Sequence, residues 1–70
     1  MEIGKKIREL RMRKGLTQEE LANRSELSKG FISQLENDVT SPSIATLVDV
    51  LTCLGTDLKT FFGEEQDNQV

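Results

Sequence analysis

The sequence contains few of the residues on which metal centres, disulfides and most catalytic sites depend. Among its 70 residues there is no histidine, and there is only one cysteine and one proline. A single cysteine cannot form an intramolecular disulfide, and without histidine a structural zinc site lacks ligands. The chain also offers no plausible nucleophile–base pair and no glycine-rich phosphate loop. We therefore expect neither an enzyme nor a bound cofactor or metal.

Long apolar runs are also missing. No stretch approaches the roughly 20 apolar residues of a membrane span, and the first residues do not have the pattern of a signal peptide. A reduced, cytoplasmic location without a membrane partner is the expectation. A chain of this length buries only about 60% of its unfolded surface. A compact apolar core must therefore stabilise the fold, and a dimer partner can add to it.

Charge is distributed unevenly along the chain. The formal net charge is −3, which at first sight argues against a nucleic-acid partner. Residues 1–35, however, hold eight basic and five acidic groups, whereas residues 36–70 hold one basic and seven acidic groups. Because the local field decides partner choice, the first half can present a basic face to DNA. By charge alone, both halves also fit an ordinary solvated surface.

Five segments have the apolar spacing of helices, and none has the alternation of a strand. The expected helices span residues 2–13, 17 to a break at 25–27, 28–37, 41–54 and 57–62. Short connections and the absence of a βαβ pattern predict an all-α bundle. We expect one domain over residues 1–62, followed at 63–70 by a polar tail or the start of a linker.

Capping residues mark the expected helix starts. Thr17 and Glu20 have the spacing of a capping box, in which each side chain bonds the backbone N–H of the other. The expected caps of the later helices are Ser28, Ser41 and Thr56, with Pro42 at the first position of the fourth helix. The apolar faces predict a core of Ile3, Ile7, Leu10, Leu16, Leu21, Ala22, Leu27, Ile32, Leu35, Ile44, Leu47, Val48, Leu51, Leu54, Leu58 and Phe61.

Two helical patterns separated by a short break, at residues 18–37, form the layout of a helix-turn-helix. Such a unit sets its second helix into the major groove of DNA. The chain resembles the lambda-repressor/Cro-like (Xre) helix-turn-helix family in four segments. They are RELRMRKGLTQ at 8–18, LTQEELA at 16–22, ISQLEN at 32–37 and SPSIATL at 41–47. The resemblance covers about residues 3–62.

The resemblance implies a compact five-helix domain that binds double-stranded operator DNA and regulates transcription, usually as a dimer on a palindromic operator. The alternative is an antitoxin or anti-repressor that holds a protein partner with the same fold. Relatives with the SPSIATL segment often carry a small-molecule sensing domain after it, which we expect here if the chain is a piece of a longer regulator. The acidic second half, with Phe62 and the fifth helix, is the expected dimer side.

Glu26 departs from the family, which usually has glycine in this turn; a left-handed non-glycine residue costs about 1 kcal/mol.

The third expected helix carries the candidate base-reading residues. If Ile32 and Leu35 face the core, the opposite face near the helix start consists of Lys29, Gly30, Ser33 and Gln34. Lysine can donate to guanine, glutamine can pair with adenine, serine suits several bases, and glycine lets the helix approach closely. Phe31 has two interpretations, contact with a thymine methyl group or packing against the loop near Val39.

A second set of residues is expected to bind the DNA backbone. Candidate phosphate contacts are Gln18, Ser28, Asn37, Thr40 and Ser43. Gln18 starts the second helix, where a side-chain amide and free backbone N–H groups can meet a phosphate. The family resemblance further implies an ion pair between Arg11 and Glu36, which would tie the third helix to the first.

Overall fold

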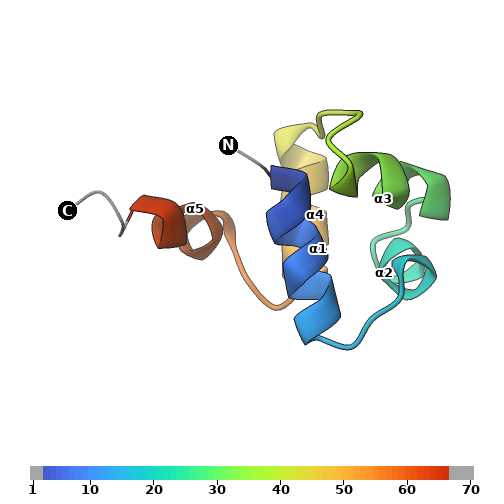
Figure 1. The fold of residues 1–70 in the computed structure, drawn as a ribbon, viewed down its shortest axis with the longest axis horizontal. Helices are drawn as coiled ribbons and strands as arrows, with labels where there is room; N and C mark the ends of the chain where they lie inside the picture. Colours follow the sequence, from blue (N-terminus) through green and yellow to red (C-terminus); the bar gives the residue numbers. More distant parts are fainter. Residues whose placement is uncertain (1–2, 67–70) are drawn as a thin grey trace.

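The structure, a computed structural model, describes residues 3–66, which contain five helices and no strand (Figure 1). The helices are α1 (Ile3–Arg13), α2 (Gln18–Arg24), α3 (Lys29–Glu36), α4 (Ile44–Cys53) and α5 (Leu58–Gln66). The predicted all-α class is therefore confirmed. The expectations for Glu2 and for residues 67–70 lie outside the described residues.

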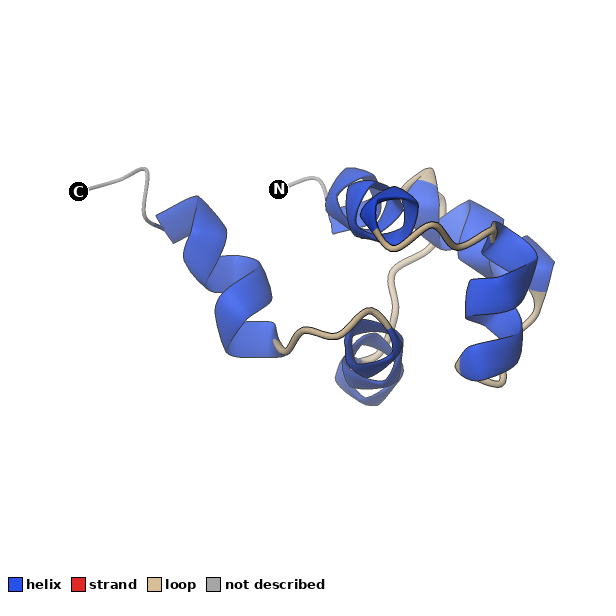
Figure 2. Ribbon diagram, turned by 90° about the horizontal axis from the view of Figure 1, so that it is seen from below, coloured by secondary structure: helices blue, strands red, loops and turns tan. Residues whose placement is uncertain are grey.

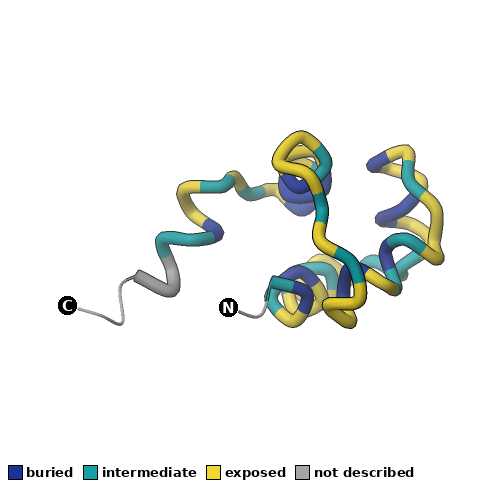
Figure 3. The backbone as a smooth tube through the Cα atoms, turned by 90° about the horizontal axis from the view of Figure 1, so that it is seen from above, coloured by how far each residue is buried: buried dark blue, intermediate teal, exposed yellow. Residues whose placement is uncertain are grey.

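Helices α1 and α4 run in a similar direction at the centre of the molecule, with the other helices on either side (Figures 1 and 2). The helix-turn-helix pair, α2 and α3, closes one side, while α5 stands on the opposite side at the end of an extended connection. Each of α1 to α4 contains buried residues, drawn dark blue in Figure 3. In this arrangement, none of the other described helices lies over the outer face of α3.

The core consists largely of the residues that the apolar faces predict. The buried apolar residues are Ile7, Leu21, Ala22, Ile32, Leu35, Leu47, Val50, Leu51, Leu54 and Phe61. The partly buried residues packed against them include Ile3, Leu10, Leu16, Leu27 and Leu58. Ala22 is buried in the helix-turn-helix, consistent with the need for a small side chain where α2 and α3 meet.

The buried face of helix α4 differs from the predicted one. Ile44 and Val48 are 67% and 40% exposed, whereas Val50, which the predicted core omits, is completely buried. Apolar residues surround most of this helix, so helical spacing allows more than one stripe. Packing against α2 and α5 selects the stripe that contains Val50. The prediction was wrong here because the partner helices, and not the period, decide the rotation.

Two helix starts also differ from the expectation. The fourth helix is capped by Ser43, whose side chain accepts from the N–H of Thr46 at 3.2 Å, so Ser41 and Pro42 precede the helix. The side chain that bonds the start of the fifth helix is that of Asp57, and not Thr56: its Oδ1 accepts from the N–H of Thr60 at 2.7 Å. Helix α5 continues to Gln66, beyond the expected end at Phe62.

The predicted capping box of α2 is present. The hydroxyl of Thr17 accepts from the N–H of Glu20 at 3.0 Å, and the Glu20 carboxylate accepts from the N–H of Thr17 at 2.8 Å. The bond from the Thr17 backbone holds the pKa of Glu20 below its usual value. The bond from the Thr60 backbone lowers the pKa of Asp57 in the same way. Both carboxylates therefore favour their charged form in the folded chain.

Among residues 3–66, two non-glycine residues adopt a left-handed backbone, Glu26 with φ 58° and Asp38 with φ 57°. The conformation of Glu26 agrees with the expectation for the turn between α2 and α3. Asp38 follows α3, and its Oδ1 accepts from the backbone N–H of Gly4 at 3.1 Å. The loop after α3 thus caps the first turn of α1 across 34 residues of sequence.

At Gly4, α1 approaches the end of α3 closely. A Cβ atom on this residue would lie 2.5 Å from the carbonyl oxygen of Leu35 and 2.6 Å from that of Glu36. These are backbone atoms, so they cannot move aside as the end of a side chain can. The absence of a side chain at position 4 is therefore what lets the two helices meet.

Helix α5 is attached to α1 through Lys6. The Lys6 ammonium lies 4.6 Å from the centre of the Phe61 ring and also donates to the Phe61 carbonyl. The Phe61 ring is buried and packs edge-on against Phe62. Lys6 therefore helps to hold α5 against α1.

Candidate nucleic-acid interface

Helix α3 presents a polar face to solvent at its start. Ser28 caps it, with its side chain accepting from the N–H of Phe31 at 3.0 Å, as predicted. Ile32 and Leu35 are buried against the core, which orients the rest of the helix. The candidate reading residues Lys29, Gly30 and Gln34 are exposed, and Ser33 is half-buried at the edge of the same face.

Phe31 is half-buried and packs against the edge of the core. Both interpretations of this side chain, contact with a thymine methyl group and packing against the loop near Val39, stay predictions. The nearby loop residue Val39 is itself exposed, so the support for Phe31 comes mainly from the core. The ring thus fixes the start of α3 on the body of the domain.

The ion pair implied by the family resemblance is present and connects α1 to α3. The Arg11 guanidinium donates to both carboxylate oxygens of Glu36, with Nε–Oε2 at 2.6 Å and Nη2–Oε1 at 3.2 Å. Its remaining nitrogen, Nη1, donates to the carbonyl of Leu16 at 2.7 Å. The side chains of Arg11 and Glu36 are only 12% and 2% exposed. This bidentate pair therefore fixes α3 relative to α1 in a largely dry environment.

Gln18 joins the same network from α2. Its Nε2 donates to Oε1 of Glu36 at 3.2 Å, and the residue is half-buried. The sequence predicts Gln18 as a phosphate contact and Glu36 as half of an ion pair, but their spacing gives no signal that the two side chains meet. Only the three-dimensional packing of α2 on α3 reveals this bond.

The other candidate phosphate contacts differ in how free their polar groups are. The Ser28 hydroxyl accepts within the helix cap, which leaves its hydrogen available to a phosphate. Asn37 donates one side-chain N–H to the Ser33 carbonyl at 2.9 Å, and Ser43 bonds to Thr46 through its hydroxyl. Thr40 is half-buried in the loop before α4. These residues lie at or beyond the two ends of α3.

Asp38 is a positioning residue that the sequence analysis missed. It holds the start of the loop that carries Thr40 and Ser43, through its left-handed backbone and its bond to Gly4. The Asn37–Asp38 pair at a helix end was the available signal, because these residue types tolerate the left-handed conformation better than others.

Two further classes of site have no support in the described residues. Within residues 3–66, no group of histidine, cysteine, aspartate and glutamate side chains is arranged to hold a metal ion. None of the described helices is both long enough and apolar enough to cross a membrane.

Comparison with known proteins identifies the family. The helix-turn-helix family HTH_3 matches residues 7–61. The chain is 35% identical over 65 residues to the immunity repressor protein of Bacillus phage phi105, covering 93% of this chain and 45% of the repressor. It is 40% identical over 63 residues to the HTH-type transcriptional regulator PuuR of Escherichia coli (strain K12), covering 90% of this chain and 34% of PuuR. The chain thus spans less than half the length of these two relatives.

Solved structures show the same fold. The restriction-modification controller protein C.Esp1396I superimposes with a TM-score of 0.82 at 30% identity, covering 90% of this chain and 82% of the controller. The clp gene regulator ClgR from Corynebacterium glutamicum superimposes with a TM-score of 0.85 at 32% identity, covering 94% of this chain and 70% of ClgR. With its five helices, its exposed α3 face and these relatives, the chain belongs to the helix-turn-helix family HTH_3, of the lambda-repressor-like type.

Proposed function

We propose that this chain is a sequence-specific DNA-binding domain of a transcriptional regulator, with α3 as the helix that enters the major groove. The observation that carries the proposal is the exposed face of Lys29, Gly30 and Gln34 on a helix whose opposite face is fixed in the core. The relatives named as a repressor and a transcriptional regulator support it. Lys29 would donate to a guanine or a phosphate, Gln34 would pair with adenine, and Ser33 would contact a base at the edge.

The DNA backbone would be held at both ends of α3. Gln18 and Ser28 would bind phosphates before the helix, and Asn37, Thr40 and Ser43 would bind them after it. These contacts fix the register of the protein on the duplex but do not read its sequence. Because the chain is acidic overall, non-specific binding should be weak, and affinity should depend on these direct contacts.

The test is selection of binding sites from random duplexes, followed by fluorescence anisotropy on the selected site at several salt concentrations. Lys29→Ala should weaken binding by roughly five- to 100-fold, as expected for loss of a base contact. Lys59→Ala removes the same charge from an exposed position of α5 and should leave affinity nearly unchanged. A salt slope near zero, or equal effects of the two variants, would argue for the protein-interaction alternative, an antitoxin or anti-repressor.

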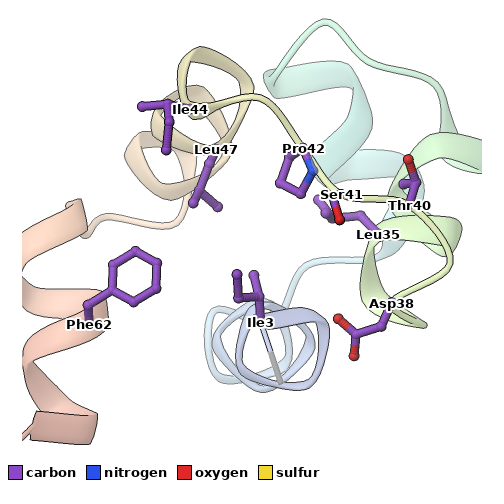
Figure 4. Close-up of a pocket in the computed structure, with 9 residues that line it drawn as sticks. All are labelled: Ile3, Leu35, Asp38, Thr40, Ser41, Pro42, Ile44, Leu47 and Phe62. Atoms are coloured by element: carbon purple, nitrogen blue, oxygen red, sulfur yellow. The ribbon is translucent and has the colours of Figure 1, made fainter. Parts of the chain in front are cut away.

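We further propose that the regulator binds as a homodimer through the face formed by α4 and α5. Ile44 and Val48 are exposed apolar residues one helical turn apart on α4. Ile44 borders a groove of about 480 Å³ that also contains Ile3, Leu47 and Phe62 (Figure 4). A second copy would cover this apolar surface while the α3 face stays free for DNA. Two copies would then read half-sites of a palindrome about one helical turn, roughly 34 Å, apart.

Sedimentation of the free protein tests the dimer. Val48→Lys places a charge in the apolar face and should shift the chain to the monomer. Met12→Lys, at an exposed apolar position on the end of α1, is the matched control and should not change the mass. A wild-type monomer at all concentrations, together with selected sites that lack a repeated half-site, would contradict the dimer.

A further inference from the structure

The buried carboxylate of Glu36 contacts more than its ion-pair partner. Besides its two bonds from Arg11, it accepts a hydrogen bond from the side-chain amide of Gln18, at 3.2 Å to Oε1. Arg11 belongs to α1, Gln18 is the first residue of α2, and Glu36 is the last residue of α3. A single carboxylate therefore links the three helices, and one of its partners is the candidate DNA-contacting side chain of Gln18.

This contact determines which atoms of Gln18 face outward. A carboxylate can only accept hydrogen bonds, so the amide nitrogen of Gln18 must be the atom that faces Glu36. One N–H of that nitrogen is used, and the carbonyl oxygen is turned away from the carboxylate. Gln18 is half-buried, so the remaining N–H and the oxygen are the groups it can offer to DNA. Without Glu36, the Gln18 amide could rotate, and its nitrogen and oxygen would exchange places.

We propose that Glu36 is a positioning residue for DNA binding, which acts by holding the Gln18 amide in one orientation. This inference rests on the proposed function and deepens it. A long side chain that is free in solution loses conformational freedom when it binds, which costs affinity. Glu36 removes part of that cost because it orders Gln18 in advance. Since Glu36 is in the same helix as Lys29 and Gln34, it also holds the amide in register with the reading face.

The expected size of the effect follows from the cost of ordering one side chain. Release of Gln18 from Glu36 should weaken DNA binding by about two- to tenfold. Loss of the amide altogether should weaken it by at least as much, since the contact to DNA disappears as well. The two losses of DNA affinity should not multiply when both substitutions are combined, because Glu36 has nothing to position once the Gln18 amide is gone.

A double-mutant cycle on DNA affinity tests the proposal. The variants are Gln18→Ala, Glu36→Gln and their combination, measured by anisotropy on the selected duplex at a temperature at which all of them are folded. Glu36→Gln keeps the shape of the side chain but offers an amide in place of a purely accepting group. We expect the double variant to bind as Gln18→Ala does. If Glu36→Gln weakens binding equally with and without the Gln18 amide, its role is merely structural and the proposal fails.

Gln34→Ala provides the matched control for the cycle. Gln34 is exposed on the reading face, and its side chain makes no bond to Glu36 among the described contacts. Its effect should therefore multiply with that of Glu36→Gln, which shows that the coupling is specific to Gln18. If the selection yields no duplex that the wild-type protein binds specifically, the proposed function itself is refuted. That result is distinct from a cycle in which Gln18 and Glu36 show no coupling.

A second variant keeps the test decisive if Glu36→Gln does not fold. Gln18→Asn retains an amide but is one methylene shorter, so it no longer reaches the carboxylate in the same geometry. It should bind DNA as weakly as Gln18→Ala. Wild-type affinity for Gln18→Asn would overturn the proposal, because an amide that Glu36 does not hold would then serve equally well.

Discussion

Substitution of Gly4 by alanine is expected to destabilise this domain, although alanine is normally the better helix residue. At most exposed helix positions this change stabilises a protein by up to about 1 kcal/mol. At position 4 the new methyl group would lie between 2.5 and 2.8 Å from backbone atoms of Leu35 and Glu36. Helix α1 would have to move away from the end of α3, which would also break the bond from Gly4 to Asp38.

The expected change in the free energy of unfolding combines these opposing contributions. Overpacking of a close contact typically costs about 1–3 kcal/mol, and loss of the hydrogen bond about 1 kcal/mol more. After the gain in helix propensity, we expect a net loss of about 2 kcal/mol. For a domain of this size, such a loss lowers the melting temperature by roughly 8–16 °C.

Thermal and urea denaturation of Gly4→Ala and Gly30→Ala measure the effect. Gly30 also lies inside a helix, but a Cβ atom there meets nothing within 4 Å. Gly30→Ala should therefore leave stability unchanged or raise it by up to about 1 kcal/mol. Equal stability of the two variants would refute the close approach of α1 and α3 as described.

Three further perturbations test the contacts that hold the helices. Glu36→Ala leaves Arg11 unpaired in a largely buried site and should cost about 3 kcal/mol in a urea titration; a change below 1 kcal/mol would contradict burial of the pair. The lowered pKa values of Glu20 and Asp57 mean that their caps stabilise the fold above the ordinary values of 4.5 and 3.8, and that this stability is lost as the pH falls through the lowered values. Glu20→Gln should accordingly flatten the acid side of a plot of melting temperature against pH, and an unchanged slope would argue against the capping box. Lys6→Ala should cost about 1 kcal/mol and speed hydrogen exchange in α5 more than in α1, because the cation–π contact and the bond to Phe61 are lost.

Local chemistry made most of the fold predictable. The Thr17–Glu20 box and the Ser28 cap act over three residues, so the sequence contains all the information about them. The left-handed backbone of Glu26 was expected from the family resemblance, because the family usually has glycine at this turn position. The all-α class was predicted from helical apolar spacing and the family from short motifs, and both are confirmed by the matching family and the solved relatives.

Contacts between distant segments could not be predicted in the same way. The rotation of α4, which buries Val50 and exposes Val48, depends on which neighbours pack against a helix that is apolar on most sides. The choice of Ser43 over Ser41 as a cap depends on where that helix starts once it has packed. The bond between Gln18 and Glu36 depends on the angle between α2 and α3, which no spacing encodes.

The distribution of helix caps also bears on how quickly the chain folds. The caps at Thr17, Ser28, Ser43 and Asp57 each bond a backbone N–H only three residues ahead. Such contacts close small loops and form early, whereas the cap from Asp38 to Gly4 must close a loop of 34 residues. Chains dominated by local contacts fold in microseconds to milliseconds. We therefore expect α2 to α5 to begin forming independently, and the junction of α1 with the end of α3 to be completed last.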